Sequence, residues 1–327
     1  MSQIVDARLA SKQTSFSEIP IIDIAKLLDG SDPQAVAEQI RAACENVGFM
    51  YITNHGVPKV LIKRMYAVTQ EFFALPLEAK EKLNIIHSGP TLRGYIPIYG
   101  ENVDPQNTRD FKECFDYGQD GSEVSPFFGA NLMPEDMPEF KQQCEDYHAA
   151  MVKLARQLIS AVALSLDLPA NYFEKLQRKP ITIQRILHYP PQKGAISQEE
   201  IGVGAHTDYG FLTILSQDQV GGLQVRNRDG EWVSAPPVQD TFIVNIGDLV
   251  QTFTNDRYIS TMHRVINTSG VERYSIPFFI DLDFDAVVTP VPTCVNEENP
   301  AKYAPYTCGQ HKYKRFVDSY QHLQGMG

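Results

Sequence analysis

Long apolar runs and basic clusters are both missing from this sequence of 327 residues. No stretch approaches the roughly 18 consecutive apolar residues that a membrane-spanning helix needs. Lysine and arginine form no dense cluster and the formal net charge is −11, which argues against nucleic acid or an anionic membrane as a partner. The polar segment 1–17 lacks the apolar core of a secretory signal, so we expect a cytoplasmic protein.

Cysteine is scarce and widely spaced in the chain. The five cysteines are Cys44, Cys114, Cys144, Cys294 and Cys308. No two of them form a Cys-x-x-Cys pair and their number is odd, so the sequence predicts neither a zinc knuckle nor a disulfide framework. We expect ordinary reduced thiols.

Apolar periodicity in the N-terminal half predicts a mixture of helices and short strands. The segments 19–24 and 49–52 are apolar and are expected to be buried strands. Asp32-Pro33 is a helix-start pattern, and it predicts a helix over 33–46 that ends before Gly48. Further helices are expected from about residue 61 to Pro76 and from Pro138 to just before Pro169.

The stretch 88–137 has a different composition. It is rich in Gly, Pro, Asn and aromatic residues, and it has no helical periodicity. A long irregular segment in a compact domain is often a functional loop or lid. A solvated connector that contains two short strands is the alternative.

After residue 180 the pattern changes to short segments of alternating polarity. The expected strands are 181–189, 212–216, 222–226, 232–234, 241–246, 261–267 and 273–281. Short strands separated by Gly-rich turns are typical of an antiparallel sandwich or barrel. We therefore predict an α+β fold with a mainly β, jelly-roll core at 176–290, an N-terminal helical region at 1–175, and a segment 291–327 whose helix, at 303–324, packs back to give one compact unit.

One short segment carries the most specific chemical pattern. Within Gly202–Gly210, His206 and Asp208 are two positions apart, so both point to one face if the segment is extended. If His263 joins them, two imidazoles and one carboxylate leave three adjacent positions free on a metal, as in non-haem Fe(II) oxygenases. The His-x-Asp spacing alone is weak evidence for a metal, because most histidines are surface or core residues.

A second pattern lies on the expected strand 273–281. Arg273 and Ser275 share one face of that strand, and a buried guanidinium binds a carboxylate through two parallel hydrogen bonds. The pair is therefore suited to the far end of a dicarboxylic co-substrate, unless Arg273 pairs with a structural Asp or Glu. Tyr189 is either a further hydroxyl for the same ligand or a core aromatic residue.

The ordered motifs resemble the isopenicillin N synthase-like family of Fe(II)/2-oxoglutarate-dependent dioxygenases, including plant members and the bacterial ethylene-forming enzyme. The matching segments are Ile19–Asp23, Gly48-Phe49, Asn54–Pro58, Arg93–Tyr95, Tyr189–Pro191, Gly204–Asp208, Gly221–Val225, Asn245–Asp248, Thr254–Asp256, Ser260–Val265 and Arg273–Ser275. They extend over nearly the whole chain in the order that the family shows.

The resemblance implies a double-stranded β-helix that holds Fe(II) on His206, Asp208 and His263. It implies 2-oxoglutarate as co-substrate, with its C5 carboxylate on Arg273 and Ser275, together with O2 and ascorbate as an optional reductant. The implied reaction oxidises a small molecule, by hydroxylation or a related C–H oxidation, and releases succinate and CO2. We expect a monomer or a weak homodimer.

The same resemblance places the segment 88–115 at the wall of the substrate pocket. Arg93 is then a candidate for binding an anionic substrate group, Glu113 for an amine, and Tyr95 or Phe115 for stacking on a ring. Phe279 is a candidate for lining the pocket from the core side. Ordinary surface roles are the alternative for each of these residues.

Two other functions stay open at this point. Leu187 stands where many plant members have an asparagine that helps hold the co-substrate, and the run 273–279 resembles that of isopenicillin N synthase, where the Arg/Ser pair holds the substrate carboxylate. These features suit a 2-oxoglutarate-independent oxidase of the isopenicillin N synthase or 1-aminocyclopropane-1-carboxylate oxidase type. A non-catalytic binding protein or metal sensor on the same fold is the third candidate.

Overall fold

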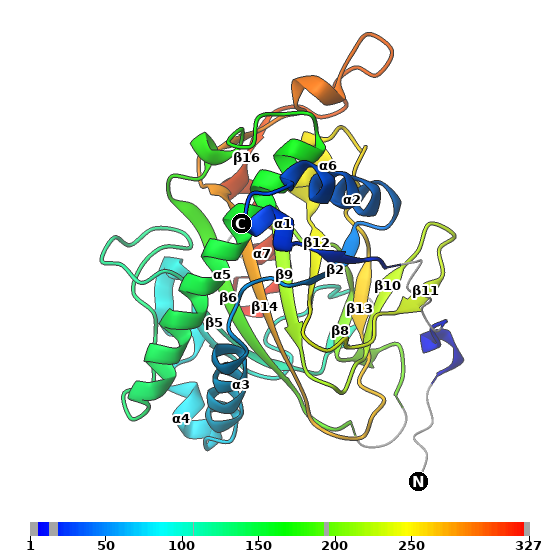
Figure 1. Cartoon of the computed structure of the whole chain (residues 1–327). Helices are drawn as coiled ribbons and strands as arrows, with labels where there is room; N and C mark the ends of the chain where they lie inside the picture. Colours follow the sequence, from blue (N-terminus) through cyan, green and yellow to red (C-terminus); the bar gives the residue numbers. More distant parts are fainter. Residues whose placement is uncertain (1–5, 13–18, 107, 193–195, 324–327) are drawn as a thin grey trace.

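The computed structural model describes residues 6–12, 19–106, 108–192 and 196–323 (Figure 1). Two β-sheets form the centre of the fold. The larger sheet has eight strands in the order β1-β2-β12-β9-β14-β6-β5-β3, and the smaller has four in the order β11-β10-β13-β8. A cavity lined by side chains from both sheets lies between them, which is the arrangement of a jelly roll.

The strands of the larger sheet are mostly short and buried. Their bounds are β1 Ile21–Asp23, β2 Phe49–Thr53, β3 Gly94–Ile96, β5 Glu113–Tyr117, β6 Pro180–Tyr189, β9 Leu212–Gln217, β12 Phe242–Ile246 and β14 Arg273–Asp283. Those of the smaller sheet are β8 Val203–His206, β10 Leu223–Arg226, β11 Trp232–Ser234 and β13 His263–Val265. Four further two-residue strands are β4 Arg109–Asp110, β7 Glu200–Ile201, β15 Val287–Val288 and β16 Tyr306–Thr307.

Helices cover the outer side of the larger sheet (Figure 1). The α-helices are α1 Ala25–Leu28, α2 Pro33–Asn46, α3 Lys59–Phe73, α4 Leu77–Glu81, α5 Pro138–Ser165, α6 Asp248–Phe253 and α7 Cys308–Ser319. The predicted start of α2 is confirmed, because Asp32 caps it by accepting a hydrogen bond from the amide of Ala35 and Pro33 occupies its first turn. The long helix α5 buries a stripe that includes Phe140, Tyr147 and Leu158.

Several expected bounds differ from those in the structure. The C-terminal helix α7 is shorter than the predicted 303–324, because Pro305 interrupts the start of that segment, and Gln324 lies outside the described residues. The strand expected at 261–267 is paired only over β13. The segment 88–137 contains β3, β4 and β5, so most of its regular structure is short strands, and β3 and β5 join the larger sheet.

One hydrophobic cluster joins the parts of the described chain. It includes Ile22 and Ile40 near the N-terminus, Ile214 in the jelly roll, and Phe316 and Leu323 at the C-terminus. The prediction of a single compact unit agrees with this shared core, whereas the boundaries at residues 175 and 290 stay a prediction. Within the described ranges, no helix combines the length and apolar character needed to cross a membrane.

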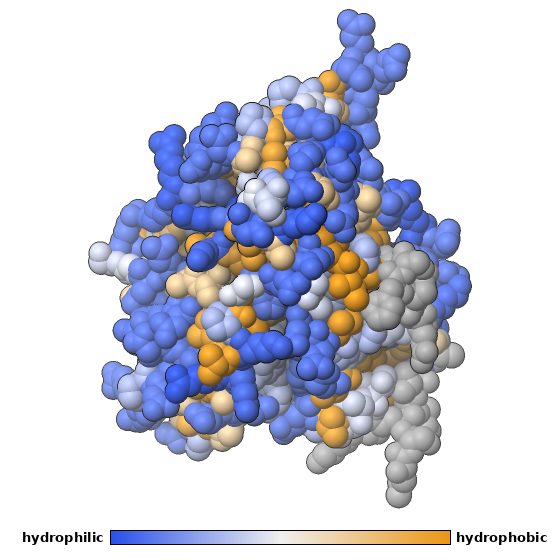
Figure 2. Space-filling model, viewed as in Figure 1, coloured by the Kyte–Doolittle hydropathy of each residue, from blue (hydrophilic) through white to orange (hydrophobic). Residues whose placement is uncertain are grey.

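The surface is mainly hydrophilic on the face drawn in Figure 2, with small separate apolar areas. The most exposed large apolar side chains include Val60 on α3, Leu77 on α4, Val124 in a loop and Val271 before β14. Each of these side chains lies on a different element or loop.

Candidate active site

Two histidines are placed opposite each other by strand pairing. β13 pairs with β8 in antiparallel fashion, and His263 is the direct partner of His206 in that register. Their ring centroids are 4.2 Å apart. The ladder thus brings together residues that are far apart in the sequence, which sequence spacing alone does not show.

Asp208 completes the group, but by a route that differs from the prediction. β8 ends at His206, so Asp208 lies in the turn after the strand, not on its face. The backbone of this turn is held by the start of α6, because the amide of Asp248 donates to the carbonyl of Asp208 at 2.9 Å. The amide of Leu249 likewise donates to the carbonyl of Gly210 at 3.2 Å.

The three side chains converge with the geometry of a metal site. Asp208 Oδ1 is 3.7 Å from His206 Nε2 and 3.6 Å from His263 Nε2. One ligand atom from each residue lies within 4.8 Å of the others, and this is the group of metal-binding type found among the described residues. The separations of Asp208 Oδ1 from the two imidazole nitrogens suit atoms that share one ion at about 2.0–2.2 Å.

The two imidazoles are fixed in the form that a metal requires. His206 Nδ1 lies 2.9 Å from the carbonyl of Gly204, and His263 Nδ1 lies 3.1 Å from the carbonyl of Thr261. Since a carbonyl only accepts, each Nδ1 carries the hydrogen and donates it. The Nε2 atoms are therefore bare acceptors that face Asp208, as in metal-bound histidines with an oriented second nitrogen.

The Asp208 carboxylate is held from behind by two donors. Its Oδ2 accepts hydrogen bonds from Thr213 Oγ1 at 2.5 Å and from Asn245 Nδ2 at 2.6 Å. Oδ1 is thereby turned toward the histidines. The sequence reasoning did not assign these two residues, although Asn245 lies in one of the motifs that carry the family resemblance and Thr213 lies on a predicted strand.

The electrostatics of the group favour the ligand forms. Burial, and then the positive form of His263, lower the pKa of His206 to about 4. Burial alone would raise the pKa of Asp208, but His263, His206, Asn245 and Thr213 together lower it. At neutral pH His206 is therefore neutral and Asp208 is ionised, which fits a divalent cation.

Arg273 is the second notable group of the site. It is fully buried on β14 at 0% exposure, and no carboxylate within the described ranges forms an ion pair with it. Its guanidinium donates to the Gly221 carbonyl, to Ser275 Oγ at 3.3 Å and to Gln217 Oε1 at 3.4 Å. A buried cation without a counter-charge is costly, and Arg273 lines a cavity, so an anion bound there would stabilise it. The alternative of a structural Asp or Glu partner is thereby excluded for the described chain.

Tyr189 and Leu187 lie on the strand next to Arg273 and Ser275. β6 pairs with β14 so that Tyr189 is opposite Arg273 and Leu187 is opposite Ser275. The Arg273 guanidinium lies 4.7 Å from the centre of the Tyr189 ring, which stacks a cation on an aromatic face. Tyr189 therefore orients the arginine as well as lining the same cavity.

A single cavity of about 80 Å³ joins the triad to Arg273. Its walls include Phe49, Lys112, Arg185, Leu187, Tyr189, Val203, His206, Asp208, Leu215, Leu223, Asn245, His263, Arg273, Ser275 and Phe279. A second cavity of about 60 Å³ lies on the other side of Arg185 and Phe279, and it shares His206 and Asp208 with the first. Phe279 lines both cavities, and its contact with a substrate stays a prediction.

The other four substrate candidates are not brought to these cavities. Arg93 is buried at 2% exposure and donates to the carbonyls of Gln119, Phe127 and Gly129, so it holds a loop together. Phe115 packs against Phe72 at 4.9 Å in the core.

Glu113 and Tyr95 are also engaged elsewhere. Glu113 is bound by Lys80 at 2.7 Å, by Tyr95 at 2.6 Å and by His188 at 2.8 Å, all on the outer side of the larger sheet. The predictions of substrate contact for Arg93, Tyr95, Glu113 and Phe115 are therefore corrected.

Alternation along β5 and β6 explains the correction. Glu113 pairs with His188 and Phe115 with Ile186, whereas Asp116 pairs with Arg185. Arg185 and Leu187 face the cavity, so their neighbours His188 and Ile186 face outward, together with Glu113 and Phe115. The sequence reasoning chose the wrong face of β5 and missed Lys112 and Arg185.

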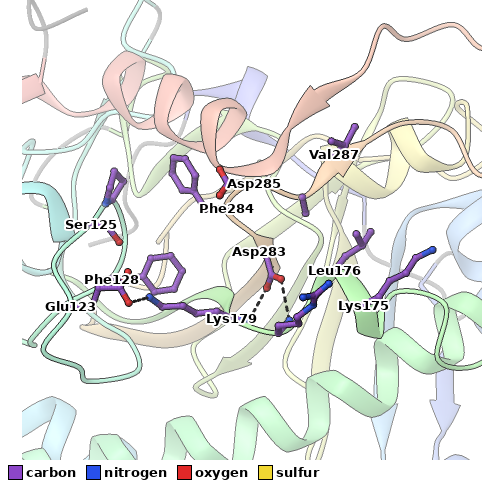
Figure 3. Close-up of a pocket in the computed structure, with 13 residues that line it drawn as sticks. Glu123, Ser125, Phe128, Lys175, Leu176, Lys179, Asp283, Phe284, Asp285 and Val287 are labelled. Carbon is purple, nitrogen blue, oxygen red and sulfur yellow. Dashed lines mark hydrogen bonds and ion pairs between the residues drawn. The ribbon is translucent and has the colours of Figure 1, made fainter.

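A larger cavity of about 760 Å³ lies on the surface at the far end of β14 (Figure 3). Figure 3 shows Lys179 paired with Glu123 across it, and the amide of Lys179 donates to Asp283. Its walls contain no histidine and no cysteine. This surface cleft thus lacks the ligand chemistry of the inner site, and its charges are paired or exposed.

Comparison with known proteins gives matches along most of the chain. A family model described as the 2OG-Fe(II) oxygenase superfamily matches residues 180–282. A second model, described as the N-terminal region of a non-haem dioxygenase in morphine synthesis, matches residues 19–136. The first covers the triad together with Arg273 and Ser275.

Full-length relatives and solved structures agree with these matches. The homoarginine-6-hydroxylase 2-ODD-C23 of Glycine max is 37% identical over 336 residues, which cover 95% of this chain and 97% of the relative. The 2-oxoglutarate-Fe(II) type oxidoreductase hxnY of Emericella nidulans is 36% identical over 88% of this chain and 86% of its own length. A full-length Neurospora crassa protein, crystallised with alpha-KG and thymine, superimposes with a TM-score of 0.81 at 27% identity, covering 92% of this chain and 96% of the Neurospora chain.

Proposed function

Because this chain belongs to the 2OG-Fe(II) oxygenase superfamily, we propose that His206, Asp208 and His263 are its iron ligands and that Arg273, Ser275 and Tyr189 hold its 2-oxoglutarate. The protein is an Fe(II)- and 2-oxoglutarate-dependent oxidoreductase. Bound iron supplies the oxygen chemistry that couples decarboxylation of 2-oxoglutarate to oxidation of a second molecule, with release of succinate and CO2. Relatives named as 2-oxoglutarate-dependent enzymes favour this function over the 2-oxoglutarate-independent oxidase and over the non-catalytic binding protein.

The observation that carries the co-substrate assignment is the lone charge of Arg273. A buried guanidinium that has no carboxylate partner in the described part of the chain lines the same cavity as the triad. A dicarboxylate bound with one end toward the triad and the other toward Arg273 supplies the missing charge. Ser275 offers a further hydroxyl, and Leu187 offers none, so the Arg/Ser pair provides the polar contacts at that end.

Part of the wall of this site is apolar. Phe49, Val203, Leu215 and Leu223 form apolar walls of the cavity. Electrostatic interactions between Arg273, the triad and a bound anion are therefore stronger than they are in water. We infer that these walls keep the reacting atoms dry while His206, Asp208 and His263 hold them in place.

We propose hydroxylation or a related C–H oxidation as the reaction of the small-molecule substrate. Support comes from relatives named as homoarginine-6-hydroxylases and from the Neurospora crassa protein that was crystallised with thymine. L-homoarginine is therefore the first substrate to assay for succinate release. Phe279, which separates the two cavities, is proposed to contact the substrate.

We propose further that the protein works in the cytoplasm as a monomer or weak homodimer and binds no nucleic acid. The net charge of −11 and the scattered exposed apolar side chains support this. All five cysteines are buried and free, which suits a reducing compartment. Light scattering of the purified protein at micromolar concentration tests the assembly: a stable dimer or larger particle would contradict it.

The co-substrate assignment is tested by replacing Arg273. Arg273→Met keeps an apolar stem and removes the charge, so we expect the affinity for 2-oxoglutarate to fall by about 100-fold, in line with the loss of about 3 kcal/mol for one partner of a buried charge pair. Calorimetric titration of 2-oxoglutarate into the anaerobic Fe(II)-loaded protein measures this. Arg226→Met, on the exposed end of β10, is the control. Equal affinity in wild type and Arg273→Met, or no binding in wild type, would refute the assignment.

A further inference from the structure

We propose, on the basis of the proposed function, that the 60 Å³ cavity beside the metal ligands binds the substrate as a small zwitterion of the basic amino-acid class. Glu101 binds its ammonium group, and Lys312 and Arg185 bind its carboxylate. This cavity is called the charged chamber below. Its walls are Glu101, Val103, Ile183, Arg185, His206, Asp208, Tyr209, Gly210, Phe279, Lys312 and Phe316.

The position of the charged chamber suits a substrate. It shares His206 and Asp208 with the cavity that holds Arg273, so a ligand in it lies next to the metal. Arg185 and Phe279 form the wall between the two spaces. The co-substrate and the substrate thus have separate compartments that meet at the triad.

Three buried ionic side chains from different parts of the chain meet in the charged chamber. Glu101 is 4% exposed, Arg185 on β6 is 8% exposed and Lys312 on α7 is 4% exposed. Burying charged groups costs desolvation free energy, and hydrophobic residues of similar size often stabilise a fold as much as a buried ion pair does. Their presence around a cavity next to the reacting centre therefore points to a polar ligand.

These side chains have hydrogen-bond donors and an acceptor that the described residues do not use. Arg185 donates four hydrogen bonds, to Asp116 twice, to Glu101 and to Tyr320, which leaves one of its five N–H groups. Among the described residues, Asp281 is the one hydrogen-bond acceptor of Lys312 Nζ, at 2.6 Å, which leaves two further hydrogens.

Glu101 supplies the complementary acceptor. Its Oε2 is 2.8 Å from Arg185 and 3.1 Å from Lys112, while no donor among the described residues reaches Oε1. Burial alone would raise the pKa of Glu101, but Arg185 and Lys112 outweigh burial and lower it to about 2. The charged chamber therefore offers spare donors and one spare anionic oxygen, which together match an ammonium and a carboxylate on one molecule.

The charge balance favours a ligand with an additional positive group. Two ion-pair groups border the charged chamber. One contains Glu101, Asp110 and Asp116 with Lys112 and Arg185, and the other contains Asp281 with Lys312. Four negative and three positive formal charges leave a net charge of −1. An amino acid with a cationic side chain has a net charge of +1 and neutralises it, while Phe279, Phe316 and Ile183 provide apolar contact for its methylene groups.

Direct binding to the loaded protein tests the ligand class. The probes are L-lysine, L-arginine and their homologues with one more methylene, each compared with the amine that lacks the carboxylate and the acid that lacks the α-amino group. Calorimetry is done anaerobically with Fe(II) and 2-oxoglutarate present. We expect at least one amino acid to bind 10-fold or more tightly than both of its partial analogues. Binding of none of the amino acids, or equal binding of the partial analogues, overturns the proposal.

Two variants test which side chain binds which charged group of the ligand. Glu101→Gln is expected to weaken binding of the amino acid at least 10-fold and to leave binding of the acid analogue unchanged. Lys312→Met is expected to weaken binding of the amino acid and of the acid analogue, but not binding of the amine. Glu123→Gln and Lys179→Met remove the ion pair of the surface cleft in Figure 3 and serve as matched controls. Unchanged affinities in folded Glu101→Gln and Lys312→Met contradict the assignment. If either variant fails to fold, the probe series on wild-type protein still decides the ligand class.

Titration of 2-oxoglutarate into the same samples separates this proposal from the proposed function. If 2-oxoglutarate binds and no amino acid does, the ion network is purely structural and the zwitterion proposal is wrong. If 2-oxoglutarate itself does not bind, the proposed function fails, and the substrate proposal that rests on it fails too.

Discussion

At the scale of single residues, the orientation of one carboxylate determines what the site can do. Thr213 and Asn245 both donate to Oδ2 of Asp208, so only Oδ1 is presented to the histidines. A carboxylate that uses one oxygen leaves more positions on an ion free for a co-substrate and O2 than one that uses two. We infer that these two donors keep the site open.

Thr213→Val tests this inference with little change in shape. The variant loses the hydroxyl that donates to Asp208, and we expect divalent-metal affinity to fall by about 10-fold, as is typical when a hydrogen bond to a metal ligand is removed. Calorimetry with Co(II) under anaerobic conditions measures the affinity. Thr241→Val, whose hydroxyl donates to a loop carbonyl, is the matched control. An unchanged Co(II) affinity in Thr213→Val would show that Asn245 alone suffices.

The structure brings together the site residues that motifs suggested, and it places elsewhere those whose position depended on strand parity. The triad and the Arg273/Ser275 pair came from spacing together with ordered motifs. Glu113 and Phe115 were chosen over Lys112 because a sequence does not show which face of a strand meets the cavity. The role of Arg185 depends on its pairing with Asp116 across two strands, which becomes visible only in the folded sheet.

At the scale of elements, the short helix α6 supports the metal-binding turn. Its first amides hold the carbonyls of Asp208 and Gly210, and Gly247 precedes it in close contact with the same turn. A Cβ at Gly247 would lie 2.2 Å from the Gly210 carbonyl oxygen, so no side chain fits there without moving the turn. The motif Asn245–Asp248 thus joins a donor to Asp208 with a helix start that fixes its backbone.

Gly247→Ala is therefore expected to reduce both stability and metal binding. Overpacking of this kind costs about 1–3 kcal/mol of unfolding free energy, and displacement of Asp208 should lower Co(II) affinity as well. Urea unfolding and Co(II) calorimetry report the two effects. Gly121→Ala, where a Cβ meets nothing within 4 Å, is the control and should change neither. A variant with wild-type stability and affinity would show that the turn yields freely.

The long helix α5 contributes a buried histidine to its contact with the larger sheet. His148 Nε2 lies 3.0 Å from Thr182 Oγ1 on β6, between the rings of Tyr117 and Phe278. Burial, and then the charge of Arg93, lower the pKa of His148 to about 4. In the unfolded chain this histidine has a pKa near 6.5. Between about pH 6.5 and pH 4 the unfolded state therefore binds more protons than the folded state.

The stability that His148 confers is consequently present above pH 6.5 and lost as the pH falls toward 4. Between pH 7 and pH 5 we expect this residue to account for about 2 kcal/mol of the loss in unfolding free energy. His148→Gln keeps a side chain that can hydrogen-bond with Thr182 but removes the titration, so its loss over the same interval should be smaller by that amount. Urea unfolding at both pH values measures it, and parallel losses in the two proteins would contradict the assignment.

Helices whose start and buried face are encoded in their own segment could be predicted. Strand ends that depend on pairing with distant strands could not. Asp32-Pro33 and the apolar stripe of α5 mark helices whose physical causes lie within the segment itself. The end of β8 at His206 and the shortness of β13 depend on hydrogen bonds to distant strands. Short strands therefore had approximate bounds, and the extended segment considered for His206 and Asp208 is a strand only as far as His206.

At the scale of the whole molecule, two sheets and a helical layer enclose one site. Strands of both sheets contribute to the cavity between them, and α7 closes the charged chamber through Lys312 and Phe316. The jelly-roll class was predictable from the alternating segments after residue 180. The antiparallel register that sets His263 opposite His206 was not, because the sequence does not specify pairing between strands far apart in the chain.

Ligand binding should stabilise the entire fold, because the site draws on elements throughout it. With Co(II) and 2-oxoglutarate each at about 100 times its dissociation constant, each adds about 2.7 kcal/mol to the free energy of unfolding. We expect a clear rise in the thermal midpoint on adding both under anaerobic conditions. His206→Ala, which lacks one ligand, should show little or none of it. An equal rise in the variant would place metal binding elsewhere.

The most direct test of the account is an anaerobic crystal structure of the protein with Fe(II) and 2-oxoglutarate. It should show the ion on His206 Nε2, Asp208 Oδ1 and His263 Nε2, and the far carboxylate of 2-oxoglutarate on Arg273 and Ser275. An ion held by other residues, or 2-oxoglutarate bound away from Arg273, would contradict the account.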